Sequence, residues 1–225
     1  MPASIALILL AAGASTRMGQ PKQLLAYRGR SLIRYGVEVG MASVCQPIVV
    51  VVGANGDRIR GELADLPIHV VENPDWAGGS RTSIRRGIEF LETVPEYIGA
   101  AVLAVCDQPL LTARVIDQLV YTHRKLEKSI VASDYADTFG IPTLFSRELF
   151  PELLALSGGD GAKSVIERHL DEVISVPFAG GAIDLDTPED YAKFLADEIV
   201  DEKADEMVDE MVDERGDEKA DERAD

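Results

Sequence analysis

The sequence has few of the side chains that build metal clusters or disulfide frameworks. Its 225 residues include only two cysteines, Cys45 and Cys106, and three histidines. The cysteines form no CxxC pair, and no two histidines stand at the HxxxH spacing. We therefore expect neither a zinc site nor the disulfide framework of a small secreted protein.

Long hydrophobic runs are missing as well. No apolar run approaches the ~20 residues of a membrane helix. The first residues, MPASIALILLAAGAS, contain a short apolar run and an Ala-Gly-Ala that resembles a signal-peptide cleavage site. They lack the basic residues that precede the apolar run of a signal peptide. We expect a cytoplasmic protein that does not enter a membrane.

Positive charge is also scarce, because 22 lysines and arginines face 39 aspartates and glutamates, for a formal net charge of −17. A surface that binds nucleic acid needs clustered cations, so we expect no such partner. Residues 201–225 repeat Asp-Glu-x-x and hold 13 of the acidic residues. Like charges at this spacing repel in a helix, so we expect one domain, 1–198, and an acidic low-complexity tail, 199–225. The tail adds solubility in one interpretation and docks to a partner in the other.

The rest of the chain alternates apolar runs with segments of helical periodicity. Strands buried on both faces are predicted at 5–10, 47–52 and 99–105, and longer helices at 31–43, 80–94 and 112–127. This alternation predicts an α/β protein with a mostly parallel central sheet and helices on both faces. Ligands bind such sheets at the carboxyl ends of the strands. Residues 134–186 change character, and we expect them to cover the substrate as part of the same domain.

The loop after the first strand carries most of the functional information. Residues 9–25 read LLAAGASTRMGQPKQLL. Small residues let backbone N–H groups approach an anion closely. Arg17 can grip phosphate oxygens with two hydrogen bonds, and Lys22 adds a point charge. The loop is neither a Walker loop nor a GxGxxG loop.

The pattern LAAGxSxRMGxPKxLL resembles the signature of the MobA-like nucleotidyltransferases, and within them it is most similar to the molybdenum cofactor cytidylyltransferases. The resemblance covers residues 4 to about 196 and implies a three-layer, Rossmann-like nucleotide-diphospho-sugar transferase fold. It implies that Arg17 and Lys22 hold the triphosphate as catalytic residues. It also implies that the base and phosphates are bordered by Leu10, Ala11, Ala12 and Gly13. Ala-Ala-Gly goes with pyrimidine nucleotides in this family, and we hypothesise that the methyl group of Ala12 leaves too little space for a purine.

Asp107 follows the third buried strand in the motif CDQPLL. A carboxylate at that place is costly to hide, so it usually faces a ligand or a cation, and Mg²⁺ prefers one or two carboxylates together with phosphate oxygens. We predict that Asp107 is catalytic and holds Mg²⁺; the alternative is that it caps the next helix. Asp186 is the predicted second metal ligand, with a helix-start acid as its alternative role. Asp184 is the alternative candidate for this second metal ligand.

Residues 72–87 resemble the family segment that lines the base and ribose, which implies nucleotide-binding roles for Gly79, Ser80 and Ser83. Trp76, in the same segment, more often caps a core than stacks on a ligand. Two departures from the family lie in the half that meets the second substrate. Lys163 stands where the family has arginine, and Ile141 stands where the cytidylyltransferases usually have histidine.

The resemblance implies a Mg²⁺-dependent nucleotidyltransferase that transfers CMP from CTP to the phosphate of molybdenum cofactor (molybdopterin) and releases pyrophosphate. The first alternative is transfer to another phosphorylated small molecule, such as a sugar phosphate. The second is a non-catalytic carrier or chaperone of the pterin cofactor for a molybdoenzyme. An enzyme of the xanthine dehydrogenase type is the possible protein partner.

Overall fold

The computed structural model describes residues 3–183 and 185–198. It contains two compact units, Met1–Asp184 and Leu185–Asp225. The tail expected at 199–225 lies outside the described residues, so the domain boundary expected at 198/199 stays a prediction. Within 3–183 and 185–198, no helix is long and apolar enough to cross a membrane.

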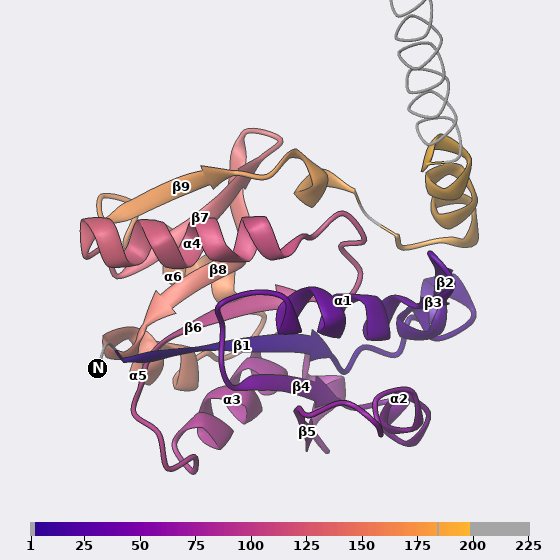
Figure 1. Cartoon of the computed structure of the whole chain (residues 1–225), viewed down its shortest axis with the longest axis horizontal. Coiled ribbons are helices and arrows are strands. Elements are labelled where there is room, and N and C mark those ends of the chain that lie inside the picture. Colours follow the sequence, from indigo (N-terminus) through magenta and orange to yellow (C-terminus); the bar gives the residue numbers. More distant parts are fainter. Residues whose placement is uncertain (1–2, 184, 199–225) are drawn as a thin grey trace, which may run out of the picture. The chain divides into compact units, whose positions relative to one another are not determined.

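The first unit is built on a seven-stranded sheet in the order β5-β4-β1-β6-β8-β7-β9 (Figure 1). Every neighbouring pair is parallel except the two pairs that include β8. The strands are β1 (Ser4–Ala11), β4 (Ile48–Val52), β5 (His69–Glu72), β6 (Ile98–Val105), β7 (Ile130–Tyr135), β8 (Thr138–Ser146) and β9 (Val173–Pro177). The predicted mostly parallel sheet is therefore confirmed, with one antiparallel strand.

Helices cover both faces of this sheet. They are α1 (Leu32–Met41), α2 (Gly56–Glu62), α3 (Ser80–Leu91), α4 (Ala113–Leu126), α5 (Phe150–Leu154) and α6 (Ala162–Arg168). Successive residues of β1 point to opposite faces, so Leu7 and Leu9 pack into the core beneath α1 and α4, and Ile8 packs beneath α3 and α5. Both faces of the central strands are buried, which explains why these strands are nearly all apolar.

Two parts of the fold differ from a simple alternation of strands and helices. Residues 134–183 add β8 and β9 to the same sheet, and their expected role in covering the substrate stays a prediction. The two-residue strands β2 (Ala26–Tyr27) and β3 (Arg30–Ser31) pair in a small antiparallel hairpin, which was not predicted from the sequence. Arg28 and Gly29 both have positive φ, of 47° and 76°, as the tightest hairpin turns require.

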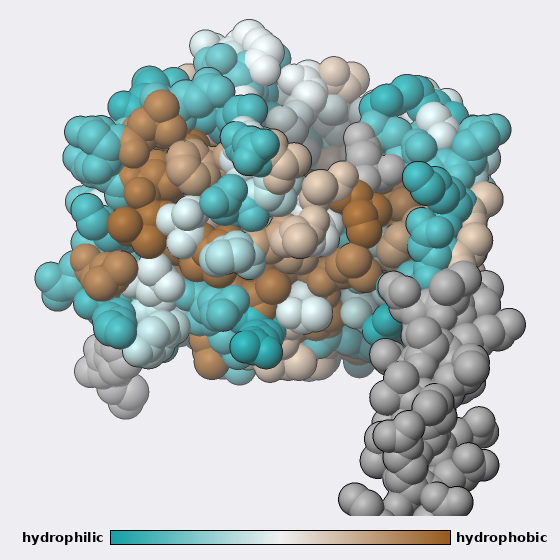
Figure 2. Space-filling view, turned by 90° about the horizontal axis from the view of Figure 1, so that it is seen from above, coloured by the Kyte–Doolittle hydropathy of each residue, from teal (hydrophilic) through white to brown (hydrophobic). Residues whose placement is uncertain are grey.

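Figure 2 shows the face that carries β9, which is the end strand of the sheet. Hydrophobic residues gather toward the left of this view, where α4 ends and β9 begins (Figures 1 and 2). Leu126 and Leu170, near those ends, are 48% and 55% exposed. This apolar surface lies at the amino ends of the parallel strands, away from the carboxyl ends that carry the candidate site.

In the second unit, residues 188–198 are helical. Thr187 precedes this helix and caps its start. The backbone N–H of Asp190 donates to Thr187 Oγ1 (3.2 Å), and the backbone N–H of Thr187 donates to Asp190 Oδ2 (2.9 Å). Hydrogen bonds from Thr187 lower the pKa of the Asp190 carboxyl.

Candidate active site

The loop that follows β1 folds into two short turns of 3-10 helix, Thr16–Met18 and Lys22–Leu24. Ser15 and Gly19 flank the first turn with left-handed backbones, at φ of 56° and 71°. Ala12 is buried, whereas Gly13 is exposed. The chain thus leaves the sheet at Ala12 and exposes the backbone of its small residues.

Gln23 holds this loop in shape, although nothing in the sequence analysis singled it out. Its side chain is 1% exposed. Nε2 of Gln23 donates to the backbone carbonyls of Ala11 (3.1 Å) and Gly13 (2.8 Å). The hydroxyl of Ser15 accepts from the backbone N–H of Lys22 (3.1 Å), which fixes the start of the second turn. Gln23 stands between Lys22 and Leu24, and no sequence pattern marks it as buried.

Lys22 and Asp107 meet across two neighbouring strands. Lys22 Nζ lies 2.5 Å from Asp107 Oδ2, and the two side chains are 17% and 23% exposed. Asp107 reaches this place because β6 pairs in parallel with β1, with Val105 beside Leu10. The structure thus brings the loop after β1 next to Asp107. Thr112, not Asp107, caps α4 by accepting from the backbone N–H of Val115 (3.4 Å).

Asp107 also suits a hard divalent cation. Its carboxylate is partly exposed at the carboxyl end of a central strand, beside a loop built to receive anions. Mg²⁺ is usually bound by one or two carboxylates plus substrate phosphates, so a single fixed carboxylate fits this type of site. Residues 3–183 and 185–198 contain no cluster of three metal-ligating side chains. Asp184 lies outside the described residues, and Asp186 belongs to the second unit, so a second ligand stays a prediction.

Arg17 is exposed within the first turn. Its backbone is fixed by the neighbouring hydrogen bond in which the N–H of Met18 donates to the carbonyl of Ser15 (3.1 Å). A long, exposed guanidinium on a fixed turn can reach a phosphate in the loop. Its predicted contact with the triphosphate stays a prediction.

Asn73 organises the segment between β5 and α3. It is fully buried, and its Nδ2 donates to the hydroxyls of Thr82 (2.9 Å) and Ser83 (3.0 Å). Its Oδ1 accepts from the backbone N–H of Asp75 (3.0 Å). The Ser83 hydroxyl is therefore buried and engaged with Asn73, and a direct contact of Ser83 with a nucleotide stays a prediction. The Asn-Pro dipeptide at 73–74, which favours a turn, is the signal that could have identified Asn73.

The start of α3 lies beside the glycine-rich segment 158–161. Gly79 has φ of 89° and precedes Ser80, the first residue of α3, and both are exposed. Nε of Arg81 donates to the carbonyl of Gly158 (2.7 Å). A Cβ placed on Gly161 would lie 3.3 Å from Ser80 Oγ. The structure thus brings the start of α3 next to the loop that precedes α6.

Gln108 connects the Asp107 turn to β8. Its Nε2 donates to the carbonyl of Ile141 (2.7 Å), which also accepts from the hydroxyl of Tyr135 (3.1 Å). Burial raises the pKa of Tyr135. The backbone carbonyl of Ile141 thus accepts hydrogen bonds from Gln108 and Tyr135, at the position where the cytidylyltransferases usually have histidine.

Cysteine and histidine take no part in this arrangement. Cys106 is buried next to Asp107, and burial first and the Asp107 charge second raise the pKa of its thiol. His123 pairs through Nδ1 with the carbonyl of Lys128 (2.7 Å), and His169 pairs through Nε2 with Glu152 (2.7 Å). His69 begins β5 at the amino end of the sheet. The site offers a cation, a carboxylate and backbone N–H groups rather than a cysteine or histidine nucleophile.

A parallel α/β sheet with a small-residue loop, a lysine and an aspartate at its carboxyl edge defines a nucleotide-binding protein. The chain belongs to the MobA-like NTP transferase family, whose domain model matches residues 7–173. It is therefore a nucleotidyltransferase by family, and the recognition made from the loop pattern is confirmed.

Two relatives cover most of the chain. It is 30% identical to nicotine blue oxidoreductase from Paenarthrobacter nicotinovorans, over 84% of this chain and 95% of that protein. It is 26% identical to purine catabolism protein PucB from Bacillus subtilis (strain 168), over 82% of this chain and 92% of that protein. It also matches bifunctional protein GlmU from Syntrophotalea carbinolica, but spans only 29% of that longer protein.

Solved structures agree with the fold. Rv0371c from Mycobacterium tuberculosis H37Rv is 27% identical, with a TM-score of 0.75 over 87% of this chain and 100% of that chain. A complex of Rv0371c with manganese aligns with a TM-score of 0.70, at 27% identity over 86% and 98% of the two chains. Molybdopterin-guanine dinucleotide biosynthesis protein A from Archaeoglobus fulgidus has a TM-score of 0.62 at 17% identity, over 88% and 99% of the two chains, and shows the shared fold alone.

Proposed function

We propose that the protein transfers CMP from CTP to the phosphate of molybdopterin and releases pyrophosphate. The observation that carries the proposal is the contact between Lys22 and Asp107, which joins the small-residue loop to the carboxylate of β6. When a nucleotide and its metal ion bind, the lysine can move to a phosphate oxygen and the aspartate can bind the metal ion. That exchange suits a substrate that carries its own divalent ion.

The loop would hold the triphosphate through backbone N–H groups and two cations. Lys22 and Arg17 neutralise phosphate oxygens, and residues 12–15 allow the backbone to come close because their side chains are small. Gln23 keeps the loop in the geometry of the bound state before the substrate arrives. Such preorganised charge stabilisation is usually the largest contribution in a site of this kind.

The divalent ion, which we take to be Mg²⁺, would bind Asp107 and the phosphates and supply charge neutralisation. A relative 27% identical was solved in complex with manganese, which supports the use of a divalent ion. Asp186 is the proposed second carboxylate.

The reaction needs no general base. An oxygen of the acceptor phosphate, which is already ionised, forms the new bond to the α-phosphorus of CTP. The bond between the α-phosphorus and the bridging oxygen breaks, and its electron pair leaves with pyrophosphate. The chain therefore has to position and neutralise charge, which agrees with a site without histidine.

CTP is proposed because Ala12 borders the space for the base. Its methyl group is buried where the chain leaves β1, next to Gly53 at the end of β4. A purine needs more space than a pyrimidine at that point. Ala11, Gly13, Gly79 and Ser80 complete the proposed nucleotide site.

A second candidate function comes from the 30% identity with nicotine blue oxidoreductase over nearly its whole length. In this alternative the protein would reduce an organic dye or heterocycle with a nicotinamide cofactor. The loop after β1 lacks the GxGxxG pattern that usually binds such dinucleotides, and it carries the lysine suited to a triphosphate.

One set of assays separates these candidates. Pyrophosphate release is measured with each of the four nucleoside triphosphates, with Mg²⁺, and with molybdopterin or a sugar phosphate as acceptor. In parallel, oxidation of NADH and NADPH is followed with nicotine blue. We expect pyrophosphate with CTP and molybdopterin. Pyrophosphate release only with a sugar phosphate would show that the acceptor is a sugar phosphate. Oxidation of NADH or NADPH without pyrophosphate release would show that the protein is an oxidoreductase. No turnover despite tight pterin binding would identify a carrier, for which a molybdoenzyme of the xanthine dehydrogenase type is the proposed partner.

A further inference from the structure

Trp76 occupies an unusual place for a tryptophan. It belongs to the 3-10 turn Trp76–Gly78, between β5 and α3, and it is 37% exposed. It is a member of neither hydrophobic core of the sheet. A large aromatic side chain left this exposed beside a candidate binding site is available to a ligand.

The backbone around Trp76 is held firmly even though the side chain is exposed. The N–H of Gly79 donates to the Trp76 carbonyl (3.1 Å), and the N–H of Gly78 donates to the Asp75 carbonyl (2.8 Å). Buried Asn73 anchors the same turn from below by accepting from the Asp75 N–H. Because the turn is already ordered, a ligand that contacts the ring would not have to order the backbone first.

Gly53 places Trp76 close to the loop after β1. A Cβ on Gly53 would lie 2.6 Å from Cβ of Trp76, 2.7 Å from the carbonyl oxygen of Ala12 and 2.9 Å from Cβ of Ala12. All three distances are too short for a real side chain, so only glycine fits. The N–H of Ala54 also donates to the Ala12 carbonyl (3.2 Å), which ties the end of β4 to the loop. Ala12 and Trp76 therefore both pack against Gly53 and lie close to each other.

We propose that Trp76, which lies next to Ala12, binds the nucleobase by stacking its indole ring on it. The inference rests on the proposed function, because it takes the base to lie at Ala12 while the triphosphate extends toward Lys22. Stacking tolerates any base because every base has a π-face, so Trp76 supplies affinity whereas Ala12 selects for size.

The chain supplies its own reporter for this contact, because Trp76 is its only tryptophan. CTP with Mg²⁺ is titrated into the full-length protein while emission is excited at the red edge of tryptophan absorption. We expect quenching with CTP and with cytidine, and none with inorganic triphosphate, which lacks a base. Quenching by inorganic triphosphate equal to that by CTP would overturn the proposal, because the loop alone would then cause the change.

Variants test the energetic contribution. Trp76→Ala is expected to weaken CTP binding about tenfold, measured by calorimetry, whereas Trp76→Phe keeps a stacking ring and loses at most about threefold. Inorganic triphosphate should bind both variants as it binds the wild type. Tyr121→Ala, which removes a 63% exposed aromatic ring from α4, is the matched control and should bind CTP normally.

Calorimetry also separates this inference from the proposed function. If CTP binds with wild-type affinity to Trp76→Ala, or binds the wild type without quenching, the stacking proposal is wrong and the transferase proposal stands. If the wild-type protein binds no nucleoside triphosphate, the proposed function is wrong and the stacking proposal is overturned with it. Equal melting temperatures of Trp76→Ala and Trp76→Phe would exclude a folding defect as the cause of any difference between them.

Discussion

Lys22 and Asp107 neutralise each other in the nucleotide-free protein, yet each remains partly accessible to solvent. A pair of this kind keeps a cation and an anion in place at little cost until phosphate and metal replace the partners. Asp107 was predictable because it breaks an apolar pattern just after a buried strand, and Lys22 because it lies in the small-residue loop that follows the first strand. Gln23 and Asn73 were not predicted, because a buried amide is identified by the carbonyls and hydroxyls that surround it in the fold.

Removing either partner of this pair should slow the chemical step strongly. We expect Lys22→Ala and Asp107→Ala each to lower kcat for pyrophosphate release by about a hundredfold or more, about 3 kcal/mol, because each takes away charge stabilisation of the transition state. Lys125→Ala, a lysine on α4, is the control. Near-normal turnover in either site variant would show that the pair is structural only.

Ala12→Gly tests the size of the base site. Removing the methyl group should raise the ratio of GTP to CTP use, because space opens where a purine would lie. The ratio of kcat/KM for the two nucleotides is the measurement, with Ala42→Gly, at an exposed position after α1, as the matched control. An unchanged ratio would show that the Ala12 methyl group does not select between pyrimidine and purine nucleotides.

Among the secondary-structure elements, the central strands were the most predictable from the sequence. β1, β4 and β6 are buried on both faces and therefore appear as unbroken apolar runs. The direction of β8 could not be predicted, because an extended segment has the same residue pattern in either direction. The hairpin β2–β3 was missed because strands of two residues carry no periodicity.

The loop after β1 should depend on Gln23 for its stability. Gln23→Ala leaves the carbonyls of Ala11 and Gly13 without their buried donor, so we expect a loss of about 1–3 kcal/mol in the free energy of unfolding, read from urea denaturation. Gln20→Ala, at an exposed position in the same loop, should have little effect. Equal unfolding midpoints for the two variants would mean that the loop does not need its amide support.

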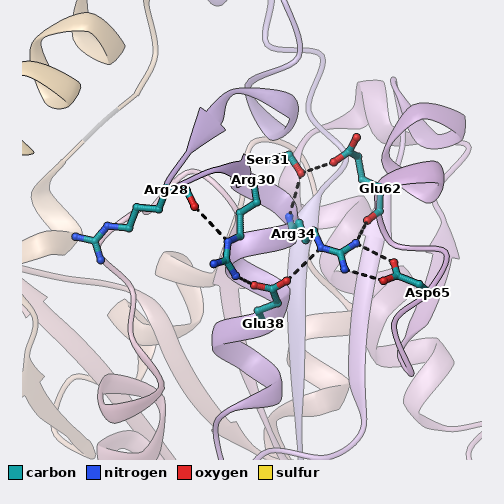
Figure 3. A network of polar contacts seen from close by, with 7 residues as sticks. All are labelled: Arg28, Arg30, Ser31, Arg34, Glu38, Glu62 and Asp65. Carbon is teal, nitrogen blue, oxygen red and sulfur yellow. Dashed lines mark hydrogen bonds and ion pairs between the residues drawn. The ribbon is translucent and has the colours of Figure 1, made fainter.

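Polar side chains join the hairpin to its neighbours (Figure 3). Arg34 of α1 donates to Glu38 (3.1 Å) and grips Asp65 with two hydrogen bonds (2.8 and 2.7 Å). Ser31, the last residue of β3, donates to Glu62 of α2 (2.8 Å). The network therefore connects the segment that follows Lys22 with two helices.

Asp65 offers a pH test of that network. The hydrogen bond from Arg34 lowers the pKa of its carboxyl from 3.8 to about 2. Because the pKa of this carboxyl is lower in the folded protein than in the unfolded chain, its ionisation stabilises the folded state at pH values above 3.8. This contribution is lost as the pH falls from 3.8 toward 2. We expect Arg34→Ala to move the pKa back toward 3.8, followed by NMR titration of the carboxyl carbon. Arg58→Ala, which removes an exposed arginine of α2, should leave the pKa lowered; a pKa near 3.8 in the wild type would contradict the contact.

The first unit brings together residues from distant parts of the chain because parallel strands end at one edge. Residues 12–23 follow β1, Asp107 follows β6, and residues 73–80 follow β5. The sequence predicted that these three segments share an edge. It could not predict that the segment 158–161 joins α3, because that contact depends on how α6 packs against the sheet.

A crystal structure with CTP and Mg²⁺ tests the central claim most directly. The account predicts that the triphosphate lies along residues 11–22, with Lys22 moved from Asp107 to a phosphate oxygen and the metal ion bound by Asp107. A nucleotide bound elsewhere, or a triphosphate in the loop with the Lys22–Asp107 contact intact and no metal at Asp107, would contradict it.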